Sequence, residues 1–460
     1  MMKSILLSTL LTIFIFTGCA PKQAMIKADM LVAQGSYKDA AAFTSQNINK
    51  RDIYDKNNLL WQLQSGSAYL FANDTNKSIS HFDSSEELMK YYREQILAQD
   101  ITQTIKSTLL NDTTRPYIGS EYDGIMTNTY KALAYMKKDD MSGARVEFNR
   151  AMDRQRRAKI FFSEMIQKEQ EAIRDEEIKN QKEGKNLSVS DATTNSILTQ
   201  NYPSLHNYEA YPDFVNPMST YLAGLFAYSD ADSNKAYSLL KEAHAMMPQN
   251  SDVKKDFHSE PKEPTVWVIF ENGQAPVLKE WRIDFPIWIF TGRLSYISVA
   301  LPRLVERELA FNYLKFQTDT NTTYNTSYLC SMENVIKTEF EKIYPSIVRR
   351  AILSTATKAA INYTIQEQAN NNGSGWAALA SVASAIYQIA STQADTRMWT
   401  TLPKEFHLAR FSRPQNGKLY IKTPNNILIK SLDLPKRDKI LIYVKIPTPY
   451  AKASVLVIPF

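Results

Sequence analysis

Histidine, cysteine and serine are the side chains most often used for catalysis, and none of them is arranged for it in this sequence. The five histidines are scattered, and none has a second metal ligand three or four residues away. Cys330 lies among apolar residues, which is typical of a buried side chain. No serine lies in a Gly-x-Ser-x-Gly turn, and Gly373-Ser374-Gly375 lacks the lysine of a phosphate loop. We therefore expect no enzymatic activity, metal, cofactor or nucleotide.

Asp395, Arg397 and Trp399 form the most distinctive polar cluster of the chain. Because Asp395 and Arg397 are two residues apart, they cannot share one face of a helix. Each is therefore expected to pair with a different element and to join a helix to a sheet. Recognition of a partner protein is the alternative interpretation for all three residues.

The N-terminus has the pattern of a secretion signal. After a lightly basic start, the apolar run Ile5–Phe16 is too short to span a membrane. It ends in Phe16-Thr17-Gly18-Cys19, which resembles the lipobox of bacterial lipoproteins. The resemblance implies that residues 1–18 are removed and that Cys19 is acylated, with palmitate or a similar chain, as a membrane anchor. Ala20, in place of Asp, implies by the enterobacterial sorting rule the periplasmic face of the outer membrane.

Length and composition fit a folded protein with more than one core. The chain has 460 residues, of which 44% are hydrophobic. Its 54 basic and 48 acidic residues nearly balance, which excludes the electrostatic surface typical of nucleic-acid binding. Cys19 and Cys330 are the only cysteines, so acylation of Cys19 leaves no partner for a disulfide within the chain.

Residues 29–248 repeat a spacing of small and aromatic side chains that is typical of stacked helical hairpins. Gln34–Ala40 resembles the turn inside a tetratricopeptide repeat. Three further copies have their turns at Asn73-Asp74, Asp139-Asp140 and Ala231-Asp232. We expect residues 19–250 to form an all-α, tetratricopeptide-like solenoid; the alternative is a helical bundle without a repeat.

A charged insertion and a loop interrupt these repeats at about residues 154–201. Arg150–Lys185 is densely charged and predicts a long helix that continues from the third copy. Its polar side is either a solvated face or a partner-binding face. Asn186–Asn201 is rich in Ser, Thr and Asn and predicts a loop.

Three tyrosines follow this loop in a segment interrupted by prolines. They are Tyr202, Tyr208 and Tyr211. Either this extended segment lines the concave groove of the solenoid and binds a partner there, or it packs against the fourth hairpin as a cap.

Beyond residue 250 the period of the sequence changes. Residues 251–264 are polar and predict a linker. Thr265–Phe270 and Val277–Phe285 predict two strands joined by an Asn-Gly hairpin turn. Met332–Gln368 has helical spacing with a break or kink at Pro345, and Trp376–Ala394 predicts an apolar helix that is either a core helix or a membrane-inserting one.

The end of the chain predicts four more strands. They span Lys418–Lys422, Asn426–Leu432, Lys439–Ile446 and Ser454–Phe460. We therefore expect residues 265–460 to form a smaller mixed α/β domain with mainly antiparallel strands. The fold class of the whole chain is then α+β.

Three blocks of sequence carry a wider resemblance. They are Asn128–Tyr135, Ala144–Ala151 and Ala394–Trp399, the last followed by Leu402-Pro403. Together they resemble an uncharacterised family of bacterial tetratricopeptide-like lipoproteins over nearly the whole mature chain. Genes of that family often lie near lipoproteins similar to penicillin-binding-protein activators, so the resemblance implies a role in envelope or peptidoglycan assembly.

These predictions favour an exported, lipid-anchored scaffold that binds an envelope protein or peptide through the groove of its helical repeats. The membrane contact is the N-terminal lipid, and no nucleic acid is expected as a partner. Two other classes remain open: an envelope enzyme or regulator of a peptidoglycan enzyme, and a structural component of a secretion or motility complex.

Overall fold

The computed structural model describes residues 20–98, 115–182, 215–289, 293–371 and 393–460, and single positions between 194 and 211. Within these ranges it is a mixed α/β structure with ten helices and eleven strands. The predicted signal peptide with Cys19, Tyr208 and most of the helix predicted over residues 376–394 lie outside the described residues.

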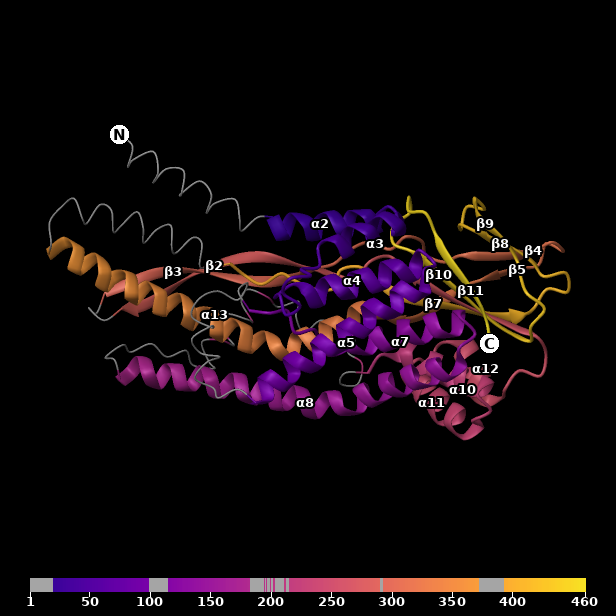
Figure 1. Cartoon of the computed structure of the whole chain (residues 1–460), viewed down its shortest axis with the longest axis horizontal. Helices are drawn as coiled ribbons and strands as arrows, with labels where there is room; N and C mark the ends of the chain where they lie inside the picture. Colours follow the sequence, from indigo (N-terminus) through magenta and orange to yellow (C-terminus); the bar gives the residue numbers. More distant parts are fainter. Residues whose placement is uncertain are drawn as a thin grey trace.

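Four antiparallel helical hairpins follow one another in the N-terminal half (Figure 1). They are α2 (Ala20–Ala33) with α3 (Tyr37–Gln46), α4 (Asn58–Phe71) with α5 (Thr75–Ala98), α7 (Glu121–Lys137) with α8 (Met141–Lys182), and α10 (Pro217–Ser229) with α11 (Ser233–Met246). The four turns are those predicted from the sequence. α8 is also the predicted long charged helix.

All four hairpins use the same turn. The second-last residue before the second helix has a left-handed backbone, with φ of 72° at Gly35, 66° at Asn73, 62° at Asp139 and 57° at Ala231. The next N–H donates to a carbonyl five residues earlier, closing the first helix as in a Schellman motif. This shared geometry confirms the alignment of the four copies.

The helices of each hairpin cross closely because small residues lie at the crossing. Five residues after each left-handed position the side chain is fully buried, and these side chains are Ala40, Ser78, Ala144 and Ala236. In the first helices, a Cβ on Gly66 would come within 2.6 Å of the Phe82 ring, and one on Gly224 within 2.8 Å of Leu240. Larger side chains at these positions would push the helices apart.

Two β-sheets make up most of the C-terminal half. The five-stranded sheet has the order β11 (Ser454–Pro459), β10 (Lys439–Ile446), β1 (Thr265–Asn272), β7 (Glu405–Ser412) and β6 (Ser327–Ser331). β1 and β10 are parallel, and the other neighbours are antiparallel. The four-stranded sheet, with the order β5 (Thr323–Asn325), β4 (Lys315–Thr318), β8 (Lys418–Lys422) and β9 (Leu428–Asp433), is antiparallel.

The five-stranded sheet is the middle of three layers. Every residue of β1 is buried, and its side chains alternate between two cores. Val266 and Phe270 pack toward the four-stranded sheet, with Phe316 of β4. Trp267 and Ile269 belong to a second core that also contains the helices. The helical half therefore shares one core with the inner face of the five-stranded sheet, and the four-stranded sheet closes a second core on the other face.

A buried ion pair joins the helices to the sheet. Glu271 of β1 and Lys445 of β10 point toward the helical layer, and their charged atoms lie 2.5 Å apart. The Tyr130 hydroxyl of α7 donates to the Glu271 carboxylate at 2.8 Å, and the Tyr443 hydroxyl donates to the same oxygen at 2.5 Å. Burial lowers the pKa of Lys445, against the charge of Glu271. The inner face of the helical hairpins is thus covered by this chain's own strands.

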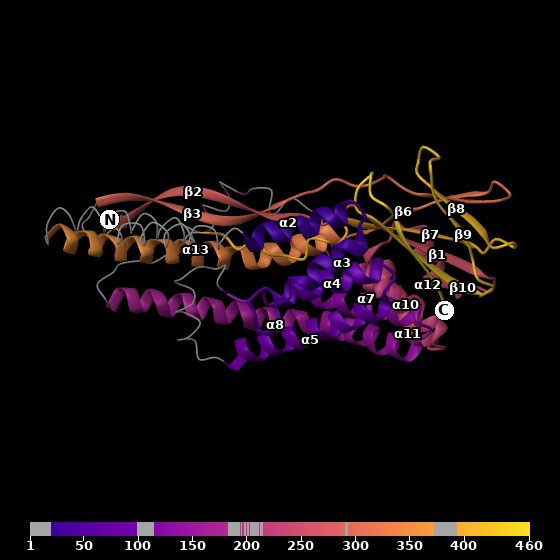
Figure 2. The same cartoon turned by 45° about the horizontal axis from the view of Figure 1, so that its top comes forward.

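A long arm extends away from the three layers (Figures 1 and 2). It consists of the antiparallel strands β2 (Val277–Ile289) and β3 (Arg293–Val305), the helix α13 (Met332–Asn371) and the outer part of α8. α13 is joined to the layers by Glu339, whose carboxylate accepts the backbone N–H groups of Glu121 at 2.9 Å and Tyr122 at 3.3 Å. No helix within the described ranges combines the length and apolarity needed to cross a bilayer.

Two local predictions differ from the structure. The strands of the predicted Asn-Gly hairpin do not pair: β1 lies between β10 and β7, and β2 pairs with β3 in the arm. The predicted linker begins with the helix α12 (Ser251–His258), whose Asp256 is fully buried. Asp256 accepts hydrogen bonds from Tyr221 of α10 at 2.6 Å and from Trp267 at 2.9 Å, so this segment is part of the core.

Candidate functional site: a charged groove between two helices

A groove of about 630 Å³ lies between α5 and α8, and we call it the charged groove. Eight of its nine lining residues are ionisable. The eight are Asp83, Glu86, Glu87, Lys90 and Arg93 of α5 and Arg150, Arg154 and Arg157 of α8. The ninth lining residue is Met89 of α5. The spacing of three, four and seven residues places each set on one face of its helix, so the two faces oppose each other across the groove.

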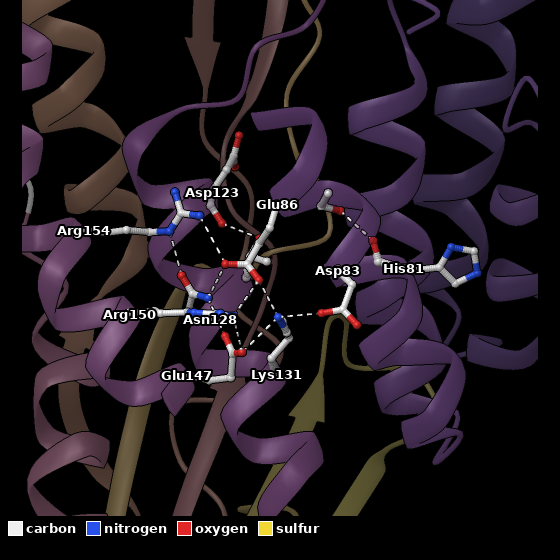
Figure 3. A network of polar contacts seen from close by, with 11 residues as sticks. His81, Asp83, Glu86, Asp123, Asn128, Lys131, Glu147, Arg150 and Arg154 are labelled. Carbon is white, nitrogen blue, oxygen red and sulfur yellow. Dashed lines mark hydrogen bonds and ion pairs between the residues drawn. The ribbon is translucent and has the colours of Figure 1, made fainter. Parts of the chain in front are cut away.

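A buried lysine from α7 lies beneath the groove and contacts the acids that line it (Figure 3). The Lys131 side chain is 1% exposed, and its Nζ lies 2.8 Å from Asp83 and 3.0 Å from Glu147, with Glu86 in direct contact. Burial alone would lower the pKa of Lys131, but the charges of Glu86 and Glu147 and the hydrogen bond that Lys131 donates to Asp83 raise it. Lys131 therefore stays charged and holds three carboxylates from two helices, α5 and α8.

Asn128 and two arginines complete this network (Figure 3). Asn128 donates to Glu86 at 2.7 Å and to Glu147 at 2.6 Å, and it accepts from Arg154 at 2.7 Å. Arg150 forms an ion pair with Glu147 at 2.8 Å. The three carboxylates are thus matched by three cations, and the inner network has no net charge.

One end of the groove carries positive charge beyond this balance. Lys90 is 76% exposed, and its neighbouring acid Glu94 is 3.9 Å away. The guanidinium of Arg157 contacts the carbonyl oxygen of Asp153 at 3.4 Å, and no ion pair is found for it among the described residues. Arg93 pairs with Glu121 at 2.7 Å and stacks on the Phe161 ring. An anionic group fits this end of the groove.

Tyr202 and Tyr211, the described tyrosines of the predicted segment, pack against other parts of this chain. Tyr202 is buried, with its ring edge-on to Tyr344 of α13. The Tyr211 hydroxyl accepts the backbone N–H of Ser331 at 2.8 Å, at the end of β6. Both tyrosines therefore pack against the C-terminal half, and the inner face of the hairpins, where a partner was expected to bind, is occupied by the five-stranded sheet.

Asp395 and Arg397 pair with each other, in contrast to the prediction that each pairs elsewhere. Arg397 donates through Nε to Asp395 at 2.9 Å and through its other nitrogens to the carbonyl oxygens of Lys56 and Arg115. The pair thus ties the segment before β7 to the helical half. Trp399 is fully buried and donates to Thr401 at 2.9 Å.

The charged groove is not predicted by the sequence. The charges of α5 and α8 have the spacing of ordinary solvated helix faces, and only Arg150–Lys185, which covers most of α8, stands out as densely charged. Lys131 is the residue that could have signalled it. It stands in α7 between residues that are otherwise apolar or small and would be buried without charge partners from the same helix.

Comparisons with known proteins give little further information. No protein family and no curated protein matches this chain. Among solved structures, a tetratricopeptide repeat protein from Parabacteroides merdae ATCC 43184 is similar over 52% of this chain and 97% of its own length. The identity is 11% and the TM-score is 0.14, so this likeness supports no conclusion about function.

Proposed function

We propose that this protein is an exported, lipid-anchored scaffold of the cell envelope that binds an acidic segment of a partner protein in the charged groove. The observation that carries the proposal is the surplus of cations at one end of the groove: Arg157 has no ion pair among the described residues, and Lys90 is 76% exposed with Glu94 3.9 Å away. Surfaces of one sign attract and orient partners of the other sign.

The shape of the groove favours an extended segment. Its α5 side runs from Asp83 to Arg93, which spans about 15 Å at the helical rise per residue. A chain in extended conformation covers that length with about five residues. The inner network of Lys131 makes the lining of the groove rigid, because each of its charges is already paired. The lining would therefore position the segment while the exposed cations bind it.

Export and anchoring are supported by the sequence. The apolar run before Cys19 and the lipobox-like residues 16–19 indicate a processed lipoprotein. The family resemblance adds a role in envelope or peptidoglycan assembly and the periplasmic face of the outer membrane as the location. A scaffold without catalysis is also consistent with a site whose ionisable groups are paired with one another.

The test is affinity capture from solubilised membranes, followed by mass spectrometry of the bound proteins, with two matched variants. Arg157→Glu reverses a charge that faces the groove. Arg156→Glu makes the same change one residue earlier, at a side chain that is 72% exposed, pairs with Asp153 and does not line the groove.

We expect Arg157→Glu to lose the partner, with binding weakened about tenfold or more, and Arg156→Glu to retain it. The captured partner should also be released as ionic strength rises, since the groove is open to solvent. Capture of the same proteins in equal amounts by both variants would refute the proposal.

A further inference from the structure

A second groove lies on the other side of α5, between this helix, α4 and the loop that follows α3. Its volume is about 580 Å³, within the range of small-molecule sites. We call it the tyrosine groove, after Tyr54 and Tyr91 in its lining. The groove has two charged side chains of opposite sign, Lys50 and Glu87, and therefore no net charge. It does not suit the acidic segment proposed for the charged groove.

The aromatic part of the groove is a pair of stacked rings. The ring centroids of Tyr54 and Tyr91 are 4.0 Å apart, with an interplanar angle of 28°. Tyr54 remains 46% exposed, so Tyr91 supports one side of its ring and the other side is open to solvent. The Tyr92 hydroxyl donates to the Tyr54 carbonyl at 3.1 Å and fixes the backbone that carries the ring.

The loop that carries Tyr54 is held rigid by a buried amide. Asn58 is 2% exposed, and its Nδ2 donates to the carbonyl oxygens of Asn49 at 3.0 Å and Asp52 at 2.9 Å. Its Oδ1 accepts the N–H of Asn49 at 2.8 Å. A ring held in this way loses little freedom when a ligand stacks on it.

Apart from Lys50 and Glu87, the polar side chains of the groove are neutral. His81 Nδ1 lies 2.6 Å from Gln62 Oε1, and the His81 ring stacks on Tyr69. Because an amide oxygen only accepts, Nδ1 carries the proton and Nε2 is left as an acceptor. Burial, and then the charge of Lys77, lower the pKa of His81, which keeps the ring neutral.

We propose that the tyrosine groove binds a neutral oligosaccharide. A pyranose ring has a flat face of C–H groups, which packs on an exposed aromatic ring, and a rim of hydroxyls. The hydroxyls both donate and accept, as do the amide of Gln62 and the hydroxyl of Ser84 in the lining of the groove. A rigid aromatic face bordered by uncharged hydrogen-bonding groups matches both parts of such a ligand.

The test is saturation-transfer NMR on the full-length protein in lauryldimethylamine oxide, a detergent without a sugar headgroup. The probes are cellobiose and N,N′-diacetylchitobiose. We expect at least one of them to receive saturation from the protein. Tyr54→Ala should weaken its binding about tenfold, and Tyr54→Phe, which keeps the ring face, should not.

Tyr237→Ala is the matched control. Tyr237 is 53% exposed and packs on Phe257 at 5.3 Å, but it lies on α11 outside the groove. We expect this variant to bind like the wild type. Arg157→Glu should also retain the sugar, because the second site is independent of the first.

Two results would overturn the proposal. One is the absence of saturation transfer to both sugars; the other is equal transfer in wild type and Tyr54→Ala. Uncharged tripeptides are tested in the same way as the competing ligand class. If these peptides bind, lose binding in Tyr54→Ala, and neither sugar binds, the groove is a peptide site.

Discussion

Replacing Gly66 by alanine tests the close helix crossing on which the repeat alignment depends. The added Cβ would lie 2.6 Å from the Phe82 ring, which must therefore move by about 1 Å to reach an ordinary contact. Phe82 is fully buried, with Tyr130 and Trp399 against it at centroid distances of 6.1 and 6.0 Å. The ring has no free space to move into.

The expected magnitude is the difference of two effects. Overpacking of a filled core costs about 1–3 kcal/mol. Alanine is favoured over glycine inside a helix by up to about 1 kcal/mol, which offsets part of that cost. We therefore expect Gly66→Ala to lower the free energy of unfolding by about 1–2 kcal/mol.

Gly143→Ala is a control with the same local clash. Its Cβ would lie 2.6 Å from the Tyr135 ring, but Tyr135 is only half-buried and can turn toward solvent. The helix preference for alanine should then dominate, with no loss of stability. The assay is urea unfolding followed by tryptophan fluorescence, since Trp61 of α4 is buried and so is Trp399, whose ring packs against Phe82. Equal midpoints for Gly66→Ala and wild type would refute the reasoning.

Two further predictions concern acid–base behaviour and anchoring. Burial, and then the charge of Glu121, raise the pKa of Glu339 to about 8, so its ionisation opposes folding: stability is greatest below the unfolded-state pKa of about 4.3 and falls as pH rises toward 8. Urea midpoints at pH 5, 6.5 and 8 should fall in wild type and fall less in Glu339→Gln; identical slopes would contradict this. Cys19→Ala should abolish labelling by a fatty-acid analogue, while Cys330→Ala, at the buried cysteine, should leave it unchanged. Label retained in Cys19→Ala would disprove the anchor.

The helical turns could be predicted because their requirements are local. A left-handed residue followed by an N-capping Ser or Asp, and a small residue four positions later, are visible in any single copy. The strands β8 and β10 were also predicted with their observed bounds, since alternation or an apolar run between prolines is a local signal.

The predicted Asn-Gly hairpin was wrong because a distant segment uses the same asparagine. Gly273 does have the positive φ of a turn, at 70°. The Asn272 side chain, however, is buried, accepts the N–H of Ala310 at 3.0 Å and donates to the Phe311 carbonyl at 2.6 Å. A local turn signal cannot show that its side chain binds a loop more than thirty residues away, which directs the following strand into the arm.

The charged groove could not be predicted for a similar reason. It exists because Glu86 of α5 and Arg154 of α8 meet over Asn128 and Lys131 of the helix between them. In sequence each of these residues looks like part of an exposed charged face. The five-stranded sheet that covers the inner face of the helical hairpins also depends on distant segments, since β1 pairs with β10 across more than 160 residues.

The helices that begin the chain are completed by its end. The Tyr37 hydroxyl donates to the Lys445 carbonyl, and Ser454 donates to the Phe71 carbonyl, in pairs separated by about 400 residues. A ribosome delivers α4 and α7 long before β10 and β11, so the apolar inner face is not fully covered until these two strands emerge. Folding then ends with a late step that cannot occur while the chain is incomplete. A polypeptide that must thread through an export channel unfolded would gain time from this order, because its own topology delays the finished fold.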